Sequence, residues 1–183
     1  GGGKRKIGRA YTKGGEYPYA NIPFRTTKGE ISNPDGSIVF SLGNIEVPNQ
    51  WSQVAADVLA QKYFRKAGVP ARLKRVEENA VPSFLWRSVA DTEALSELPK
   101  DQRHGSEISA KQVFDRLAGA WTYWGWQGGY FDTEDDAQAF SDELRYMLAM
   151  QMAAPNSPHW FNTGLHWPSA LHRLRRGHFS PAT

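Results

Sequence analysis

Two long apolar helices, predicted one after the other in the second half of this 183-residue chain, constrain its fold more than any other feature. The first begins at Ser109, whose spacing to Gln112 is that of a capping box. The second begins at Thr133, with Asp136 at the corresponding position, and Pro155 is expected to end it. Each helix carries an apolar stripe at helical spacing, and such a stripe faces the core of a domain. The sequence therefore predicts a core built on helices.

A further helix and a β-hairpin are predicted upstream of this pair. Apolar residues recur at helical spacing over 50–66, where Asn49 is the expected cap and Pro70 lies beyond the end. The tetrad Asn-Pro-Asp-Gly at 33–36 separates β-prone residues, which predicts a hairpin near 30–47. Two strands alone are marginally stable, so we expect the hairpin to lie on the helices or to join a larger sheet.

The remaining segments have weaker patterns. Residues 71–108 show no sustained period, and we expect a short helix near residue 81 followed by a polar surface loop. Residues 1–28 are rich in Gly, Lys, Arg and Tyr and predict a basic, extended arm. The aromatic residues at 17–24 either dock on a partner or pack on the domain's own helices. The expected fold class is accordingly mainly α (α+β), a helical domain with one small β-hairpin.

Charge is distributed unevenly along the chain. The formal net charge is +3, yet residues 1–28 carry seven Lys or Arg against one Glu, and residues 165–183 carry three Arg and no acid. Residues 29–164 therefore sum to −6. A nucleic-acid-binding domain gathers its basic residues on one folded face, so this pattern argues against nucleic acid as a partner and favours solvated basic ends.

Composition excludes several other classes of protein. The chain has no cysteine, which removes disulfides, thiolate catalysis and thiolate metal sites, and none of its five histidines forms a helical His-x-x-x-His pair. No metal site is expected. No apolar run approaches the roughly 20 residues that span a bilayer, and no apolar segment follows the basic start as in a secretory signal. We expect a cytoplasmic protein that does not enter a membrane.

The aromatic run at 121–131 has two interpretations. Three Trp residues and a Gly pair are typical of a platform on which bases stack. Large aromatic side chains also fill the core where a helix ends and the chain reverses. Because the run contains no Lys or Arg that would attract a phosphate backbone, we favour the core.

The segment 155–164 is the strongest candidate for a site, since no standard catalytic or phosphate-binding motif occurs elsewhere. It offers hydroxyl and amide groups that bind an anion without a cationic side chain, together with a glycine that permits close backbone approach: Asn156, Ser157, Asn162, Thr163 and Gly164. The alternative is an ordinary loop after a helix, whose Asn and Ser make turn hydrogen bonds. Residue types alone favour the ordinary loop.

Several stretches share a pattern that extends beyond this loop. They are Ile45-Glu46-Val47-Pro48-Asn49-Gln50-Trp51-Ser52, Gln61-Lys62-Tyr63-Phe64-Arg65, Val113-Phe114-Asp115-Arg116-Leu117-Ala118, Tyr123-Trp124-Gly125, Met152-Ala153-Ala154-Pro155-Asn156-Ser157-Pro158 and Thr163-Gly164-Leu165-His166-Trp167. In this order, over roughly residues 16–167, they resemble the adenosylcobalamin-dependent (class II) ribonucleotide reductases. The resemblance covers only the amino-terminal part of a much larger enzyme.

The resemblance implies a radical reaction that reduces ribonucleotides to deoxyribonucleotides for DNA replication. In that reaction adenosylcobalamin generates a thiyl radical, and a cysteine pair supplies the electrons. The helices would precede a ten-stranded α/β barrel, and the loop after the last helix would be the entry to it. Ser157 would then contact the phosphate of the ribonucleotide substrate. The side chains around it would be Asn156, Asn162 and Thr163, whereas His159 departs from the family, which more commonly has Gln there.

The resemblance ends after Trp167. It implies a helical reductase-like domain over 29–167, followed by an Arg-rich tail over 168–183 that does not match the family. We hypothesise a truncated or frame-shifted reading and expect a catalytically incomplete chain that binds no cobalamin itself, with a homodimer as one way to cover exposed apolar surface. Two alternatives stay open: a standalone helical protein-interaction module derived from the reductase, and a nucleic-acid-binding adapter that uses the basic ends.

Overall fold

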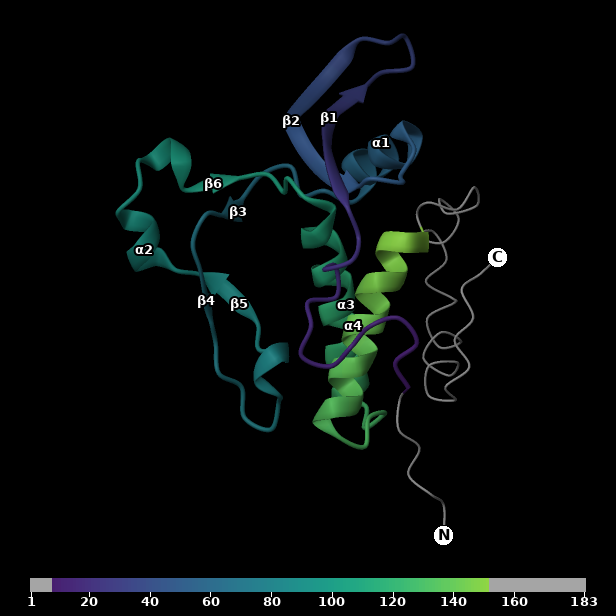
Figure 1. Ribbon diagram of the computed structural model, residues 1–183. Coiled ribbons are helices and arrows are strands. Elements are labelled where there is room, and N and C mark those ends of the chain that lie inside the picture. The colour runs from purple at the N-terminus through teal and green to yellow at the C-terminus, as the bar shows by residue number, and fades with distance from the viewer. Residues whose placement is uncertain (1–7, 152–183) are drawn as a thin grey trace.

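The computed structural model describes residues 8–151, which fold into four α-helices, two 3-10 turns and six strands (Figure 1). The two longest helices, α3 and α4, lie side by side at the centre of the molecule. In chain order the elements are β1 Phe24–Ser32, β2 Ile38–Pro48, α1 Gln53–Lys62, β3 Val69–Pro70, β4 Leu73–Arg75, the 3-10 turn Ser83–Leu85, β5 Ser88–Ala90, α2 Thr92–Ser96, the 3-10 turn Lys100–Gln102, β6 His104–Gly105, α3 Ala110–Gln127 and α4 Glu134–Gln151.

The core lies where α3 and α4 pack against each other, α3 packs against β2, and α1 packs against β1. Removing each of its large side chains from water contributes about 1.5–3 kcal/mol. Burial therefore holds together elements that are far apart in the sequence. The largest fully buried apolar side chains come from β2, α1, α3 and α4: Ile45, Val47, Leu59, Val113, Phe114, Phe140, Leu144 and Leu148.

The chain before β1 packs on this core. Residues 9–22, which we call the strap, cross α3 and α4 without regular secondary structure (Figure 1). The side chains of Tyr19 and Ile22 are buried in the core. Of the two interpretations of the aromatic residues near the amino terminus, local packing on the domain's own helices is therefore confirmed for Tyr19.

Both predicted starts of the long helices are confirmed. Ser109 accepts a hydrogen bond from the backbone of the first turn of α3, and the Gln112 side chain accepts the N–H of Ser109 at 3.0 Å, which completes the capping box. Thr133 Oγ1 accepts the N–H of Asp136 at 3.1 Å. These bonds satisfy N–H groups that the first turn of a helix leaves unpaired. The expected stop at Pro155 lies outside the described residues.

The predicted first helix is shorter than expected, and its predicted cap is wrong. Ser52, rather than Asn49, caps α1, and its hydroxyl accepts the N–H of Ala55 at 3.1 Å. The helix ends at Lys62 instead of continuing to residue 66. The buried carboxylate of Glu107 accepts the N–H of Arg65 at 2.8 Å, and this bond holds the chain outside the helix.

The expectation of a mainly helical domain with one small hairpin is wrong, because the described residues are a mixture of α and β structure. Three two-stranded antiparallel sheets pair β1 with β2, β3 with β6, and β4 with β5. β4, β5 and β6 lie in the part, residues 71–108, for which the sequence predicts a short helix and a polar loop, and β3 lies where the first helix is predicted to stop. Strands of two or three residues are too short to show a period of two, and Val69 pairs with the distant Gly105, so no local pattern reveals them.

The aromatic run at the end of α3 divides between core and surface. Phe131 is buried against Phe140, with ring centroids 5.3 Å apart. Trp126 donates its indole N–H to the Ala80 carbonyl at 2.8 Å. Trp124, in contrast, is 62% exposed. The core interpretation is therefore confirmed for Phe131 and wrong for Trp124.

Candidate functional site

The site predicted from the sequence lies outside the described residues. Asn156, Ser157, Asn162 and Thr163 all follow Gln151, the last residue of α4. The described residues nearest to that loop in the sequence are those at the carboxyl end of α4, and the structure has a pocket there.

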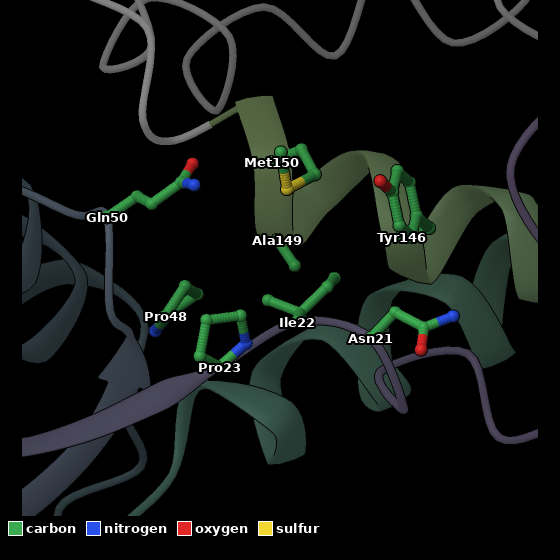
Figure 2. A pocket seen from close by; sticks show the side chains of 8 residues that line it. All are labelled: Asn21, Ile22, Pro23, Pro48, Gln50, Tyr146, Ala149 and Met150. Carbon is green, nitrogen blue, oxygen red and sulfur yellow. The ribbon is translucent and has the colours of Figure 1, made fainter.

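The pocket has a volume of about 230 Å³ and lies between the end of α4, the segment before β1 and the segment between β2 and α1. Figure 2 shows α4 along one side, with Ile22 and Pro23 opposite, Gln50 at one end and Tyr146 with Asn21 at the other. The pocket thus combines apolar walls with three uncharged polar groups. Its apolar lining consists of Ile22, Pro23, Pro48, Ala149 and Met150.

Backbone and indole hydrogen bonds fix the three segments that line the pocket. The indole N–H of Trp51, a buried side chain, donates to the Ala149 carbonyl at 2.8 Å. The N–H of Asn49 donates to the Pro23 carbonyl, also at 2.8 Å. These two bonds connect the segment between β2 and α1 to α4 and to the segment before β1, so all three segments that line the pocket are joined.

Two buried acids of α4, Asp142 and Glu143, bind the strap, and we call this pair of acids the clamp. The carboxylate of Glu143, which is fully buried, accepts the backbone N–H groups of Ala10 and Tyr11. The neighbouring carboxylate of Asp142, also buried, pairs with the Arg9 guanidinium at 2.7 Å. A buried charge is costly unless it is paired and hydrogen-bonded. The position of the strap is consequently tied to the two acids.

Aromatic contacts connect the strap to the pocket. The ring of Tyr11 stacks on that of Tyr146, a lining residue, with centroids 5.0 Å apart and 7° between the planes. Burial, and then the charge of Glu143, raises the pKa of Tyr11 above its ordinary value. Tyr19 donates its hydroxyl to Asp115 at 2.7 Å, and burial together with that carboxylate raises the pKa of Tyr19 as well. Both phenols therefore stay uncharged well above neutral pH.

The pocket provides hydrogen bonds but no charge. Its polar groups are the amides of Asn21 and Gln50 and the phenol of Tyr146, which bind an anion only through N–H or O–H donors. Pockets for drug-sized ligands measure about 300–1,000 Å³, so a volume of about 230 Å³ is too small for a cofactor as large as adenosylcobalamin. Within residues 8–151, no group of His, Asp and Glu is placed to hold a metal ion, and no helix has the length and hydrophobicity to cross a membrane.

The sequence pattern does not bring the pocket residues together: Pro48 and Gln50 belong to a stretch that carries the family resemblance, but no pattern connects them with the other lining residues. The clamp does leave a signal. Asp142 and Glu143 are adjacent acids in the middle of an apolar helix, where successive side chains point about 100° apart. Since Leu144 next to them is a core residue, at least one of the acids is expected near the buried face. That both are buried follows only from the strap lying over them.

The chain is similar in sequence to proteins of one class of enzyme, the ribonucleotide reductases. Residues 25–151 match the family described as class II vitamin B12-dependent ribonucleotide reductase. The chain is 70% identical over 174 residues to a vitamin B12-dependent ribonucleotide reductase of Bradyrhizobium diazoefficiens, and 66% identical over 174 residues to one of Agrobacterium fabrum. Each alignment covers 95% of this chain. A third such reductase, of Rhodopirellula baltica, is 30% identical over 83% of the chain.

The chain belongs to the class II vitamin B12-dependent ribonucleotide reductase family. The family match takes in all four helices of the described residues and five of the eight residues that line the pocket. The chain spans 14% of the length of the Bradyrhizobium and Agrobacterium relatives and 12% of that of the Rhodopirellula relative.

Proposed function

We propose that this chain acts as the amino-terminal region of a vitamin B12-dependent ribonucleotide reductase, an enzyme that supplies deoxyribonucleotides for DNA replication in the cytoplasm. One observation carries this proposal: 70% identity to such a reductase over 95% of the chain. The helices α3 and α4, the hairpin and the strap form the scaffold of the region. In this scaffold the clamp and the Trp51 hydrogen bond hold the carboxyl end of α4, from which the chain continues toward Ser157.

The chain by itself is proposed to be catalytically incomplete. The resemblance implies a thiyl radical and a cysteine pair, and the sequence contains no cysteine. Its own side chains therefore supply neither the radical site nor the electrons. Adenosylcobalamin is proposed as the cofactor of the whole enzyme and not as a ligand of the described pocket. Incubation of the purified chain with adenosylcobalamin, a dithiol and a ribonucleotide is expected to yield no deoxyribonucleotide, and product formation above background would refute the proposal.

The loop after α4 is proposed to bind the phosphate of the ribonucleotide substrate. Ser157 donates its hydroxyl to a phosphate oxygen in this proposal, and Asn156, Asn162 and Thr163 supply further neutral donors around it. Support comes from the residue types and from the family resemblance of the segment. Neutral donors bind a phosphate well when several of them converge on it.

Nucleotide binding is measured by the melting temperature of the chain. A ligand at ten times its Kd stabilises the folded state by about 1.4 kcal/mol, which raises the melting temperature by about 3–6 °C in a protein of this size. We expect such a rise with millimolar ribonucleotide, and its loss on Ser157→Ala. The matched control is Ser88→Ala, an exposed serine on β5, which is expected to leave the rise intact. No rise at millimolar nucleotide would contradict the loop assignment and favour a protein-interaction module.

A further inference from the structure

The hairpin of β1 and β2 divides into a packed half and a free half. In the packed half Ile45 and Val47 are buried against the helices. The register shifts directly after the pair Gly29 and Gly43. A side chain at Gly29 would lie 2.8 Å from Ile45 Cγ2, and Gly43 has a φ of +73°, so both positions favour glycine. Such irregularities bend a strand, and the rest of the hairpin projects beyond the helices (Figure 1).

The projecting half, residues 30–42, which we call the hairpin tip, exposes apolar side chains in succession. Ile38 is 57% exposed, Val39 60% and Phe40 39%. No residue from 37 to 42 carries a charge. Edge strands that face solvent usually carry charged residues, which prevent pairing with other chains. Within the tip, β1 and β2 pair only with each other among the described residues. The tip therefore has two free edges as well as an apolar surface, and it fits a protein partner.

The size of the tip decides between two partners. The exposed parts of Ile38, Val39 and Phe40 amount to about 300 Å², if a fully exposed side chain of this size presents roughly 150–250 Å². A stable complex of separate molecules buries about 800 Å² on each partner, so these three side chains supply well under half of the area that binding a second copy of the chain would have to bury. A partner in the same polypeptide needs far less, because the connection itself provides an effective concentration in the millimolar range.

We infer that the hairpin tip is a docking surface for the remainder of the reductase polypeptide, the part that the relatives carry and that this chain does not match. The relatives provide the covalent connection, since the matched region makes up 14% of their length. The inference rests on the proposed function, because it takes the chain to work as one region of such an enzyme. Docking of the tip would fix the orientation of this region on the body of the enzyme.

Amide hydrogen exchange tests the inference in the isolated chain and in the full-length Bradyrhizobium relative. We expect the amides of the hairpin tip to exchange roughly tenfold more slowly in the full-length protein. Serine at the position matching Val39 is expected to abolish that difference. Val39 is 60% exposed, so Val39→Ser leaves the core of the isolated chain intact, which its circular dichroism spectrum checks. The matched control is Val89→Ser on β5, an exposed valine outside the hairpin, which is expected to leave exchange at the tip unchanged.

Two results would overturn the inference. Equally fast exchange of the tip in the isolated chain and in the full-length relative would show that nothing covers it. Protection that appears in the isolated chain as its concentration rises, together with a dimer in light scattering, would show that a second copy covers it instead. Both results are independent of the nucleotide-induced melting shift and its loss on Ser157→Ala, so a wrong docking surface and a wrong proposed function are distinguished.

Discussion

Gly125 and Gly119 lie on the same helix, and the structure predicts opposite effects when each is replaced by alanine. A Cβ atom at Gly125 would lie 2.6 Å and 2.9 Å from two ring carbons of Phe131. A Cβ atom at Gly119 would have no heavy atom within 4 Å. Gly125 therefore lets the chain that follows α3 fold back so that Phe131 packs against the helix, whereas Gly119 has no such role.

The magnitudes follow from two contributions. Alanine in a helix is favoured over glycine by about 0.8–1.0 kcal/mol, and both substitutions gain this. Forcing an extra methyl group into a packed core costs about 1–3 kcal/mol, and only Gly125→Ala incurs it. We expect Gly119→Ala to stabilise the chain by up to about 1 kcal/mol and Gly125→Ala to fall about 1–3 kcal/mol below it. In a protein of this size that difference separates the two melting temperatures by about 2–12 °C.

Urea unfolding followed by tryptophan fluorescence measures both free energies of unfolding. A double variant, Gly125→Ala with Phe131→Leu, identifies the clash, because the smaller side chain relieves it and the two changes become less than additive. If Gly125→Ala were as stable as Gly119→Ala, the contact with Phe131 would not be the reason for the glycine. Additive effects in the double variant would likewise show that the contact with Phe131 is not the reason for the glycine.

Three further predictions concern the strap and the pocket. Glu143→Ala leaves two strap N–H groups without an acceptor, at about 1–3 kcal/mol each, so urea unfolding should show a loss of about 2–6 kcal/mol. Glu143→Gln keeps an acceptor and should lose less. Trp51→Phe removes the indole hydrogen bond to the Ala149 carbonyl and should lower the free energy of unfolding by about 1–2 kcal/mol. It should also speed amide exchange at the end of α4, and unchanged exchange there would contradict this role of Trp51. Folding raises the pKa of Tyr19 above its value of about 10 in the unfolded chain. The protonated Tyr19 hydroxyl therefore contributes its full stabilisation below pH 10, and this stabilisation is lost as the pH rises above 10. Unfolding at a series of alkaline pH values should show a smaller loss for Tyr19→Phe than for the wild type.

The parts of the fold that the sequence predicts are those that local chemistry decides. The capping box at Ser109 and the Thr133 cap mark the starts of α3 and α4, because side chains within one turn satisfy free N–H groups. The hairpin turn at 33–36 follows from its own residues, and Gly36 donates its N–H to the Asn33 carbonyl at 3.0 Å. Family membership is readable as well, because it depends on the order of residues and not on their contacts.

The errors occur where distant residues decide the local structure. Asn49 and Ser52 are equally good caps by residue type. Hydrogen bonds from Asn49 to the Pro23 carbonyl and from the Trp51 indole to the Ala149 carbonyl hold the chain before Ser52 outside the helix, so Ser52 is the cap. The ribbon of β3 and β6 forms between segments that carry no strand signal of their own. These contacts turned a fold expected to be mainly helical into a mixture of α and β structure.

The sequence by itself determined the family, the two long helices with their starts, the hairpin turn and the residues to test in the loop after α4. Tertiary structure alone decided that the two acids of α4 are buried, which half of the hairpin remains free and which residues form the pocket. The physical reason is the range of the interactions. Caps and turns act within a few residues, whereas the burial of Glu143 depends on backbone N–H groups more than a hundred residues earlier in the chain.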